Sequence, residues 1–128
     1  KKSLIYDTFK DKAKLNNSIL KMVKKIQENK IKVGVLSNLE KTTYTILEEF
    51  GFLDIFEFQF YSHKTGFAKP DRRIFKYVLG NVPFKSSEIF FIDDKISNVQ
   101  VANSIGIKSI KYVNAKKLKQ DLKHHKIL

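Results

Sequence analysis

The sequence contains no cysteine. This absence excludes a disulfide framework and thiolate chemistry, and it favours a reducing compartment, so we expect a cytoplasmic protein. Long hydrophobic runs are missing too, because no apolar stretch comes near the roughly 18 residues that a membrane span requires. No signal peptide is recognisable at the start of the sequence. We therefore expect no membrane partner.

Arginine is scarce, although the chain is strongly basic. Of its 25 basic residues only Arg72 and Arg73 are arginine, and the formal net charge is +12. Such a charge is found in nucleic-acid-binding proteins, but proteins that read a base sequence depend on the bidentate fork of arginine. The lysines are dispersed, and no base-stacking aromatic motif lies within a basic stripe. We therefore predict a solvated basic surface and no nucleic-acid partner.

The apolar residues follow a pattern of strands that alternate with helices along one domain. With 128 residues, of which 42% are hydrophobic and 11 are Phe, the chain can bury a sizeable core. Helical periodicity predicts helices at 19–27, 42–50, 72–79, 97–104 and 115–125. Short apolar runs predict strands at 31–36, 57–61, 88–92 and 107–113. This alternation predicts an α/β fold, a three-layer Rossmann-like parallel sheet.

Polar residues follow three of the predicted strands. Ser37-Asn38 comes after the first strand and Asp93-Asp94 after the third. Between them, Lys69 ends a predicted loop at 62–69, and Pro70 is expected to open the next helix. Because the carboxyl ends of parallel strands meet at one edge of a sheet, we expect these three features to form one pocket.

Each feature also has a purely structural interpretation. Asp93-Asp94 is costly unless a cation such as Mg²⁺ neutralises it, yet the pair could simply cap a helix. Lys69 could be an ordinary surface lysine, and Ser37-Asn38 could be an N-cap. Taken together, however, hydrogen-bond donors, a cation and a metal-binding pair match the needs of phosphoryl transfer.

Three segments in chain order resemble the second, third and fourth motifs of the haloacid dehalogenase-like (HAD) hydrolase superfamily: VLSN (35–38), GFAKPDRRIF (66–75) and FFIDDKISNVQVANSIGI (90–107). The chain is most similar to its sugar-phosphate phosphatases and to the phosphatase domain of epoxide hydrolases. The resemblance implies a Mg²⁺-dependent phosphatase that hydrolyses a small phosphorylated metabolite through an aspartyl-phosphate.

The resemblance also implies roles for individual residues. Ser37 and Lys69 would be catalytic. Both would bind phosphate together with Asn38, and Lys69 would neutralise the charge of the phosphate and of the nucleophile.

The acidic motif would hold Mg²⁺. The resemblance makes Asp94 the direct ligand, with Asp93 helping directly or through water, and gives Asn98 the task of orienting the acidic loop. Dehalogenating members of the superfamily lack such an Asp pair and do not need Mg²⁺, so the intact pair favours phosphatase chemistry.

The superfamily's first motif, an apolar strand ending in DxDxT, is not found. It would supply the nucleophile Asp and, two residues later, the general acid and base. LIYDTF (4–9) contains Asp7 but no second Asp at that spacing. Because the chain opens with Lys1, not Met, we expect that the natural protein starts upstream and that an N-terminal segment supplies the motif.

The missing motif shapes the expected fold. We interpret Ser3 to Lys12 as the last helix of a cap domain, so that residues 1–13 are a cap remnant and 14–128 form the core. The sheet is then incomplete at its N-terminal central strand until the missing segment fills it. We expect the chain alone to be less stable than its length suggests, and inactive.

Two other classes of protein compete with the phosphatase hypothesis. A degenerate superfamily member would keep the fold as a non-catalytic binding protein. A receiver domain of a signalling protein also combines an Asp pair, a hydroxyl residue and a Lys. Its acidic pair precedes the other two in the chain, whereas Asp93-Asp94 follows Ser37 and Lys69 here.

Overall fold

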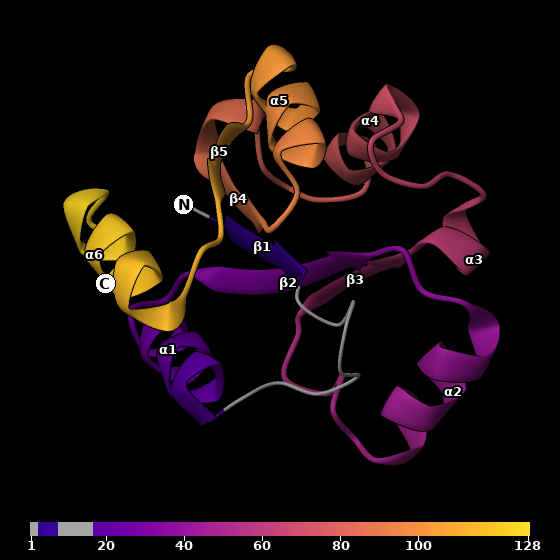
Figure 1. Ribbon diagram of the computed structural model, residues 1–128, viewed down its shortest axis with the longest axis horizontal. Coiled ribbons are helices and arrows are strands. Elements are labelled where there is room, and N and C mark those ends of the chain that lie inside the picture. Colours follow the sequence, from indigo (N-terminus) through magenta and orange to yellow (C-terminus); the bar gives the residue numbers. More distant parts are fainter. Residues whose placement is uncertain (1–2, 8–16) are drawn as a thin grey trace.

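The computed structural model describes residues 3–7 and 17–128, which form a parallel sheet with helices on both faces (Figure 1). The five strands are β1 (Ser3–Asp7), β2 (Lys32–Ser37), β3 (Phe58–Tyr61), β4 (Ile89–Asp93) and β5 (Lys108–Lys111). Their order across the sheet is β3-β2-β1-β4-β5, and every pairing is parallel. The predicted Rossmann-like α/β sheet is therefore confirmed.

The helices form the two outer layers. They are α1 (Asn17–Glu28), α2 (Lys41–Glu49), α3 (Ser62–Thr65), α4 (Arg72–Gly80), α5 (Ile96–Ser104) and α6 (Ala115–His124), and a 3₁₀ turn covers Ser86–Glu88. In Figure 1, α4 and α5 lie on one side of the sheet and α1 and α6 on the other. Among the described helices, none is long and apolar enough to cross a membrane.

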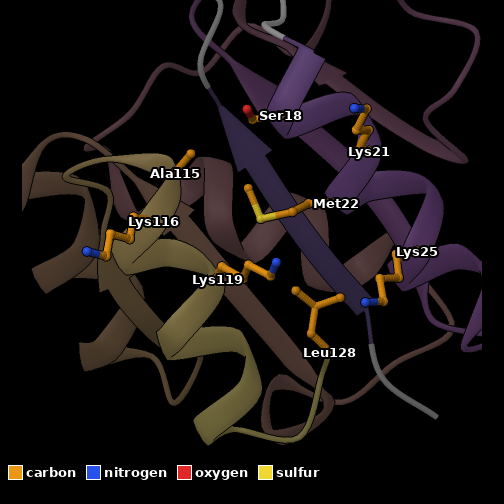
Figure 2. Close-up of a pocket in the computed structure, with 8 residues that line it drawn as sticks. All are labelled: Ser18, Lys21, Met22, Lys25, Ala115, Lys116, Lys119 and Leu128. Atoms are coloured by element: carbon orange, nitrogen blue, oxygen red, sulfur yellow. The ribbon is translucent and has the colours of Figure 1, made fainter.

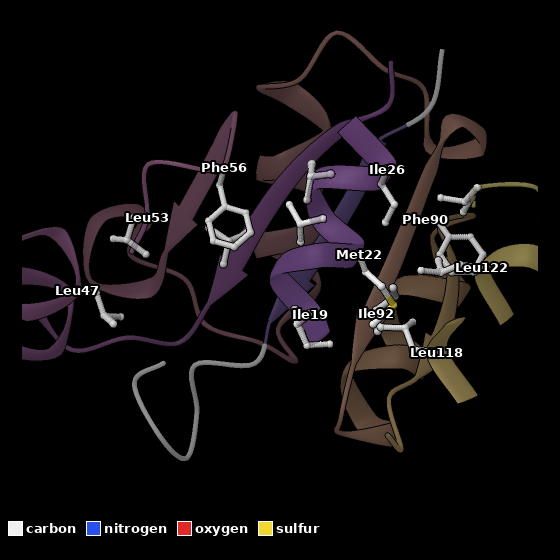
Figure 3. Close-up of a cluster of buried hydrophobic side chains, with 14 of the residues drawn as sticks. Ile19, Met22, Ile26, Leu47, Leu53, Phe56, Phe90, Ile92, Leu118 and Leu122 are labelled. Atoms are coloured by element: carbon white, nitrogen blue, oxygen red, sulfur yellow. The ribbon is translucent and has the colours of Figure 1, made fainter. Parts of the chain in front are cut away.

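Two hydrophobic clusters fill the spaces between the layers. Neighbouring residues of β4 point to opposite faces of the sheet, as the period of a strand requires. Phe90 and Ile92 pack with α1 and α6, whereas Ile89 and Phe91 pack with α4 and α5. Figure 3 shows the first cluster, with Met22 of α1 lying between the helix and the sheet. β4 is thus buried on both faces, which explains its continuous apolar sequence.

The central strand of the sheet corrects our interpretation of the N-terminus. Residues 3–7, which we predicted to be helical, form β1, and β1 pairs with both β2 and β4. Leu4, for example, lies opposite Val33 on one side and Phe90 on the other. β1 therefore occupies the central position that we expected to be vacant. The expected low stability stays a prediction. Residues 8–12 of the predicted cap helix lie outside the described residues.

The physical reason for β1 lies in its neighbours. β2 and β4 are buried strands, and without a strand between them each would leave a row of unpaired N–H and C=O groups. The run LIY (4–6) is short and apolar, and such a run fits a buried strand as well as a helix. The backbone N–H and C=O groups of β2 and β4 favour the strand conformation for residues 4–6, because they can then form hydrogen bonds with it.

The segment between β3 and α4 differs from the prediction in two details. Residues 62–65 form the short helix α3, where we expected a loop, and Gly66 ends it with a left-handed φ of 80° that glycine adopts without strain. Pro70 does not open the next helix. Asp71 caps it instead, and its side chain accepts a hydrogen bond of 2.9 Å from the Arg73 N–H.

We predict that Ile5→Pro destabilises the protein strongly. Each residue of a central strand donates its N–H to one neighbour or the other, so proline removes a buried ladder bond. The expected loss is at least about 1–3 kcal/mol in the free energy of unfolding, measured by urea denaturation. Ile5→Val, which keeps the amide, is the matched control. Rapid hydrogen exchange of the amides of residues 4–7 in the wild type would contradict a central position for β1.

Candidate active site

Four polar side chains are buried in the described part of the chain, and the sequence singled out all of them. None is more than 5% exposed: Ser37, Lys69, Asp93 and Asn98. Ser37 ends β2 and Asp93 ends β4, so both lie at the carboxyl edge of the sheet. Burying a polar group costs free energy unless the group is paired. Their joint burial at this edge marks it as the candidate site.

A buried ion pair joins the third and fourth motifs. The Lys69 Nζ donates to Asp93 Oδ2 over 2.6 Å, and neither side chain has any exposed surface. Lys69 comes from the segment before α4, whereas Asp93 is the last residue of β4. Removing one partner of such a pair would leave an uncompensated buried charge, which is strongly destabilising. The pair therefore fixes the position of both motifs relative to one another.

The Asp93 carboxylate receives two further hydrogen bonds. The Asn98 Nδ2 donates to Oδ2 over 3.1 Å, and the Lys95 N–H donates to Oδ1 over 2.9 Å. Asn98, which we expected to orient the acidic loop, lies in the first turn of α5. Both carboxylate oxygens are thus held by donors, and the strand end is fixed in place.

These contacts set the charge of Asp93. Burial raises the pKa of its carboxyl, but the Lys69 charge and the hydrogen bonds from Lys69 and the Lys95 N–H outweigh burial and hold the pKa below its usual range. Asp93 is therefore ionised at neutral pH. Because the folded-state pKa is lowered, the ion pair's contribution to stability is complete above about pH 4, the ordinary pKa of Asp. It is lost as the pH falls through the folded-state pKa.

Asn38 fixes the backbone of Lys69. Its Oδ1 accepts a hydrogen bond of 2.9 Å from the Lys69 N–H, and its Nδ2 donates to the Lys69 carbonyl oxygen over 3.0 Å. The side-chain amide thus pairs with the main chain as a neighbouring strand would. We predicted a phosphate contact for Asn38, and the structure adds a positioning role for this residue. No sequence pattern connects residues 38 and 69, which explains why this role was not foreseen.

Asp94 differs from Asp93 in its surroundings. It is exposed, whereas Asp93 is buried. The described residues contain no cluster of three or more His, Cys, Asp or Glu side chains that could hold a metal ion. Mg²⁺, however, usually binds through one or two carboxylates together with water and substrate oxygens. The adjacent pair at the end of β4 fits that smaller requirement, with Asp94 as the carboxylate that solvent reaches.

The backbone register brings one more acidic position to this edge. Asp7 is the last residue of β1 and pairs in register with Asp93. β1 lies between the strand that ends in Ser37 and the strand that ends in Asp93. The backbone register therefore places Asp7 at the same edge of the sheet as Ser37 and Asp93.

We predict that Lys69→Met and Asp93→Asn each lower the free energy of unfolding by about 3–5 kcal/mol, because each leaves one buried charge or its partner unsatisfied. The double variant should lose much less than the sum of the two single losses. Urea denaturation of all four proteins forms the double-mutant cycle. Additive losses would show that the two side chains do not interact.

We predict that Asn38→Ala lowers the free energy of unfolding by about 1–3 kcal/mol, since it leaves the N–H and C=O of Lys69 without partners. Asn114→Ala is the matched control. Its side chain caps α6 by accepting from the Lys117 N–H, and its loss should cost about 1 kcal/mol. Equal, small losses in both variants would argue against a special role for Asn38.

Comparison with known proteins indicates the same family as the three sequence motifs. The family model of haloacid dehalogenase-like hydrolases matches residues 2–112. A drimenol cyclase of Aspergillus calidoustus is 30% identical over 96 residues, which cover 73% of this chain and 18% of that protein. A sesquiterpene phosphatase of Aspergillus oryzae is 26% identical over 87 residues, or 67% of this chain and 44% of that protein. The chain thus spans less than half of each of these relatives.

A solved structure adds the fold. A HAD-family enzyme of Bacteroides thetaiotaomicron, crystallised with magnesium and inorganic phosphate, superposes with a TM-score of 0.69 and 28% identity. The match covers 78% of this chain and 54% of that one. Together with the family match over residues 2–112, these findings show that the chain belongs to the haloacid dehalogenase-like hydrolase family.

Proposed function

We propose that this chain is the core of a cytoplasmic, Mg²⁺-dependent phosphatase that hydrolyses a small phosphate ester through an aspartyl-phosphate. The observation that carries the proposal is the buried contact of 2.6 Å between Lys69 and Asp93. It holds a cation at the carboxyl edge of the sheet, beside the end of the central strand. A phosphoryl group bound at this edge would meet positive charge in a site largely closed to water, where charge stabilisation is strong.

Ser37 and Lys69 are the proposed phosphate-binding and catalytic residues. Ser37 ends β2 beside the central strand, and its hydroxyl would bind a phosphoryl oxygen at the same edge. Lys69 would compensate the charge of the phosphate and of the nucleophile. Asn38 keeps Lys69 in place through its backbone, and we propose that it contributes to phosphate binding in this indirect way.

Asp94 is the proposed direct ligand of Mg²⁺. Asp93 already accepts hydrogen bonds from Lys69, Asn98 and the Lys95 N–H, so it would act through water or by orienting the loop. When bound, the ion would supply charge neutralisation for the phosphate oxygens. The relative that was crystallised with magnesium and phosphate supports this part of the proposal.

The chain has no Asp at the position of the superfamily's general acid. In the superfamily the nucleophile attacks phosphorus, and the Asp two residues later gives a proton to the leaving alcohol and then takes one from the attacking water. We assign Asp7, the last residue of β1, to the first of these positions, and the residue two places later is Phe9. A phenyl ring transfers no proton. We therefore propose that the 128-residue chain alone does not turn over phosphate esters.

A non-catalytic binding protein is the second candidate. Phe9 in place of the proton donor favours it. A degenerate member of the family would keep Lys69 and Asp93 because they stabilise the fold, and would bind a phosphorylated metabolite without hydrolysing it. The two candidates differ in one property, which is whether restoring the missing carboxyl restores hydrolysis.

We predict that Phe9→Asp gains Mg²⁺-dependent hydrolysis of p-nitrophenyl phosphate, whereas the wild type shows none. Phe9→Asn has nearly the same shape as Phe9→Asp but cannot transfer a proton, and is the matched control. General acid–base catalysis contributes about 10²- to 10⁴-fold, so the rates of the two variants should differ by that factor. The measurement is steady-state release of p-nitrophenolate with and without EDTA.

Asp94→Asn in the Phe9→Asp background should abolish the gained activity, because it removes the proposed metal ligand. Robust hydrolysis by the wild type would show that the chain needs no second Asp at this spacing. Equal rates for folded Phe9→Asp and Phe9→Asn would favour the non-catalytic binding protein instead.

A further inference from the structure

A hollow of about 510 Å³ lies between α1 and α6, on the outer side of the sheet (Figure 2). The helices contribute the side chains at its walls, and the end of the chain closes one side. It is lined by Ser18, Lys21, Met22, Lys25, Ala115, Lys116, Lys119 and Leu128. None of these residues belongs to the candidate active site. A volume of this size is typical of sites for small molecules.

Lysine side chains give the hollow a positive charge. Four of the described residues that line it are lysines, and none of these lining residues has an acidic side chain. Figure 2 shows Lys25 of α1 and Lys119 of α6 extending toward one another, whereas the ammonium of Lys116 points away. Within the described residues no ion pair involves these lysines, and Asp121 of α6 pairs with Lys117. Ammonium groups that line one hollow repel one another, and an anion between them would relieve the repulsion.

The floor of the hollow is apolar. Met22 belongs to the first hydrophobic cluster and is 9% exposed, and Ala115 and Leu128 pack against that cluster from α6 and the chain end. In Figure 2 the Met22 side chain lies in the middle of the hollow, with Leu128 close by. The lysine stems add methylene groups to the walls. An inorganic ion would leave this apolar surface exposed to water, whereas the aliphatic part of a larger molecule would bury it.

We propose that the hollow binds one small amphiphilic anion, with a carboxylate or phosphate head between Lys25 and Lys119 and an aliphatic body over Met22. Lysine suits such a head because its compact charge binds anions without requiring the planar geometry that arginine recognises. The proposal is independent of the phosphatase function, since the two sites share no residue.

The concave shape favours a small molecule over a membrane surface. A flat layer of anionic lipid would attract the outward lysines of both helices, such as Lys24 and Lys123, as strongly as those of the hollow. Those two residues are exposed and do not line it. Replacing Lys24 and Lys123 therefore distinguishes a small molecule in the hollow from a membrane surface. These two lysines carry the same charge as Lys25 and Lys119 and lie on the same helices, but outside the hollow.

The chain offers a direct reporter for this test. Met22 is its single methionine, so a protein labelled with ¹³C at the methionine methyl gives one signal, and that signal comes from the floor of the hollow. The probe is decanoate below its micelle concentration, whose carboxylate is no phosphatase substrate. We expect the Met22 methyl signal to shift and saturate with decanoate. Acetate, which is the head alone, and 1-octanol, which is the tail alone, should bind at least about tenfold more weakly.

The matched variants decide between the hollow and general charge attraction. Lys25→Gln with Lys119→Gln should weaken decanoate binding by about tenfold or more, while Lys24→Gln with Lys123→Gln should change it by less than about twofold. Equal weakening in both pairs would overturn the proposal, as would acetate or octanol binding as well as decanoate. Binding to phosphatidylserine vesicles with no shift of Met22 by decanoate would also overturn it, in favour of a membrane surface.

Discussion

The ammonium of Lys69 and the carboxylate of Asp93 lie 2.6 Å apart with no exposed surface, and the candidate site is arranged around that contact. Two charges buried this deeply are tolerated only when they compensate one another and their remaining hydrogen-bonding atoms are also paired. The chain meets both conditions. Asn98 and the Lys95 N–H donate the remaining hydrogen bonds to the Asp93 carboxylate, and Asn38 accepts a hydrogen bond from the backbone N–H of Lys69. The third and fourth motifs are thus tied together before any ligand binds.

The sheet explains why this contact forms where it does. β4 is buried on both faces, so its direction is fixed by the two hydrophobic clusters and Asp93 must appear at its carboxyl end. β1 separates β4 from β2 and brings Asp7 into register with Asp93. Residues that are far apart in the chain therefore converge at a single edge. Core packing, a requirement of folding alone, places the polar groups of the candidate site side by side.

Most of the fold and of the site could be predicted from the sequence, and the exceptions have physical causes. The helices carry clear periodicity, as in α1, and the continuous apolar run of β4 is typical of a strand buried on both faces. The residues at the strand ends stand next to strong turn signals. β1 was missed because a run as short as LIY (4–6) has no periodicity of its own. Its strand form depends on unpaired groups of β2 and β4, which are distant in sequence. The amide pairing of Asn38 with Lys69 is likewise a contact between segments that share no local signal. The same holds for the hollow that Lys25 and Lys119 line from two different helices.

The most direct test of the account is a crystal structure of this chain grown with Mg²⁺ and inorganic phosphate. The account predicts that phosphate lies within hydrogen-bond reach of the Ser37 hydroxyl and the Lys69 ammonium, that the metal is bound to Asp94, and that the Lys69–Asp93 contact persists. Phosphate bound elsewhere, or a Lys69 side chain turned out to solvent with Asp93 left alone, would contradict the claim that this buried pair organises a phosphate site.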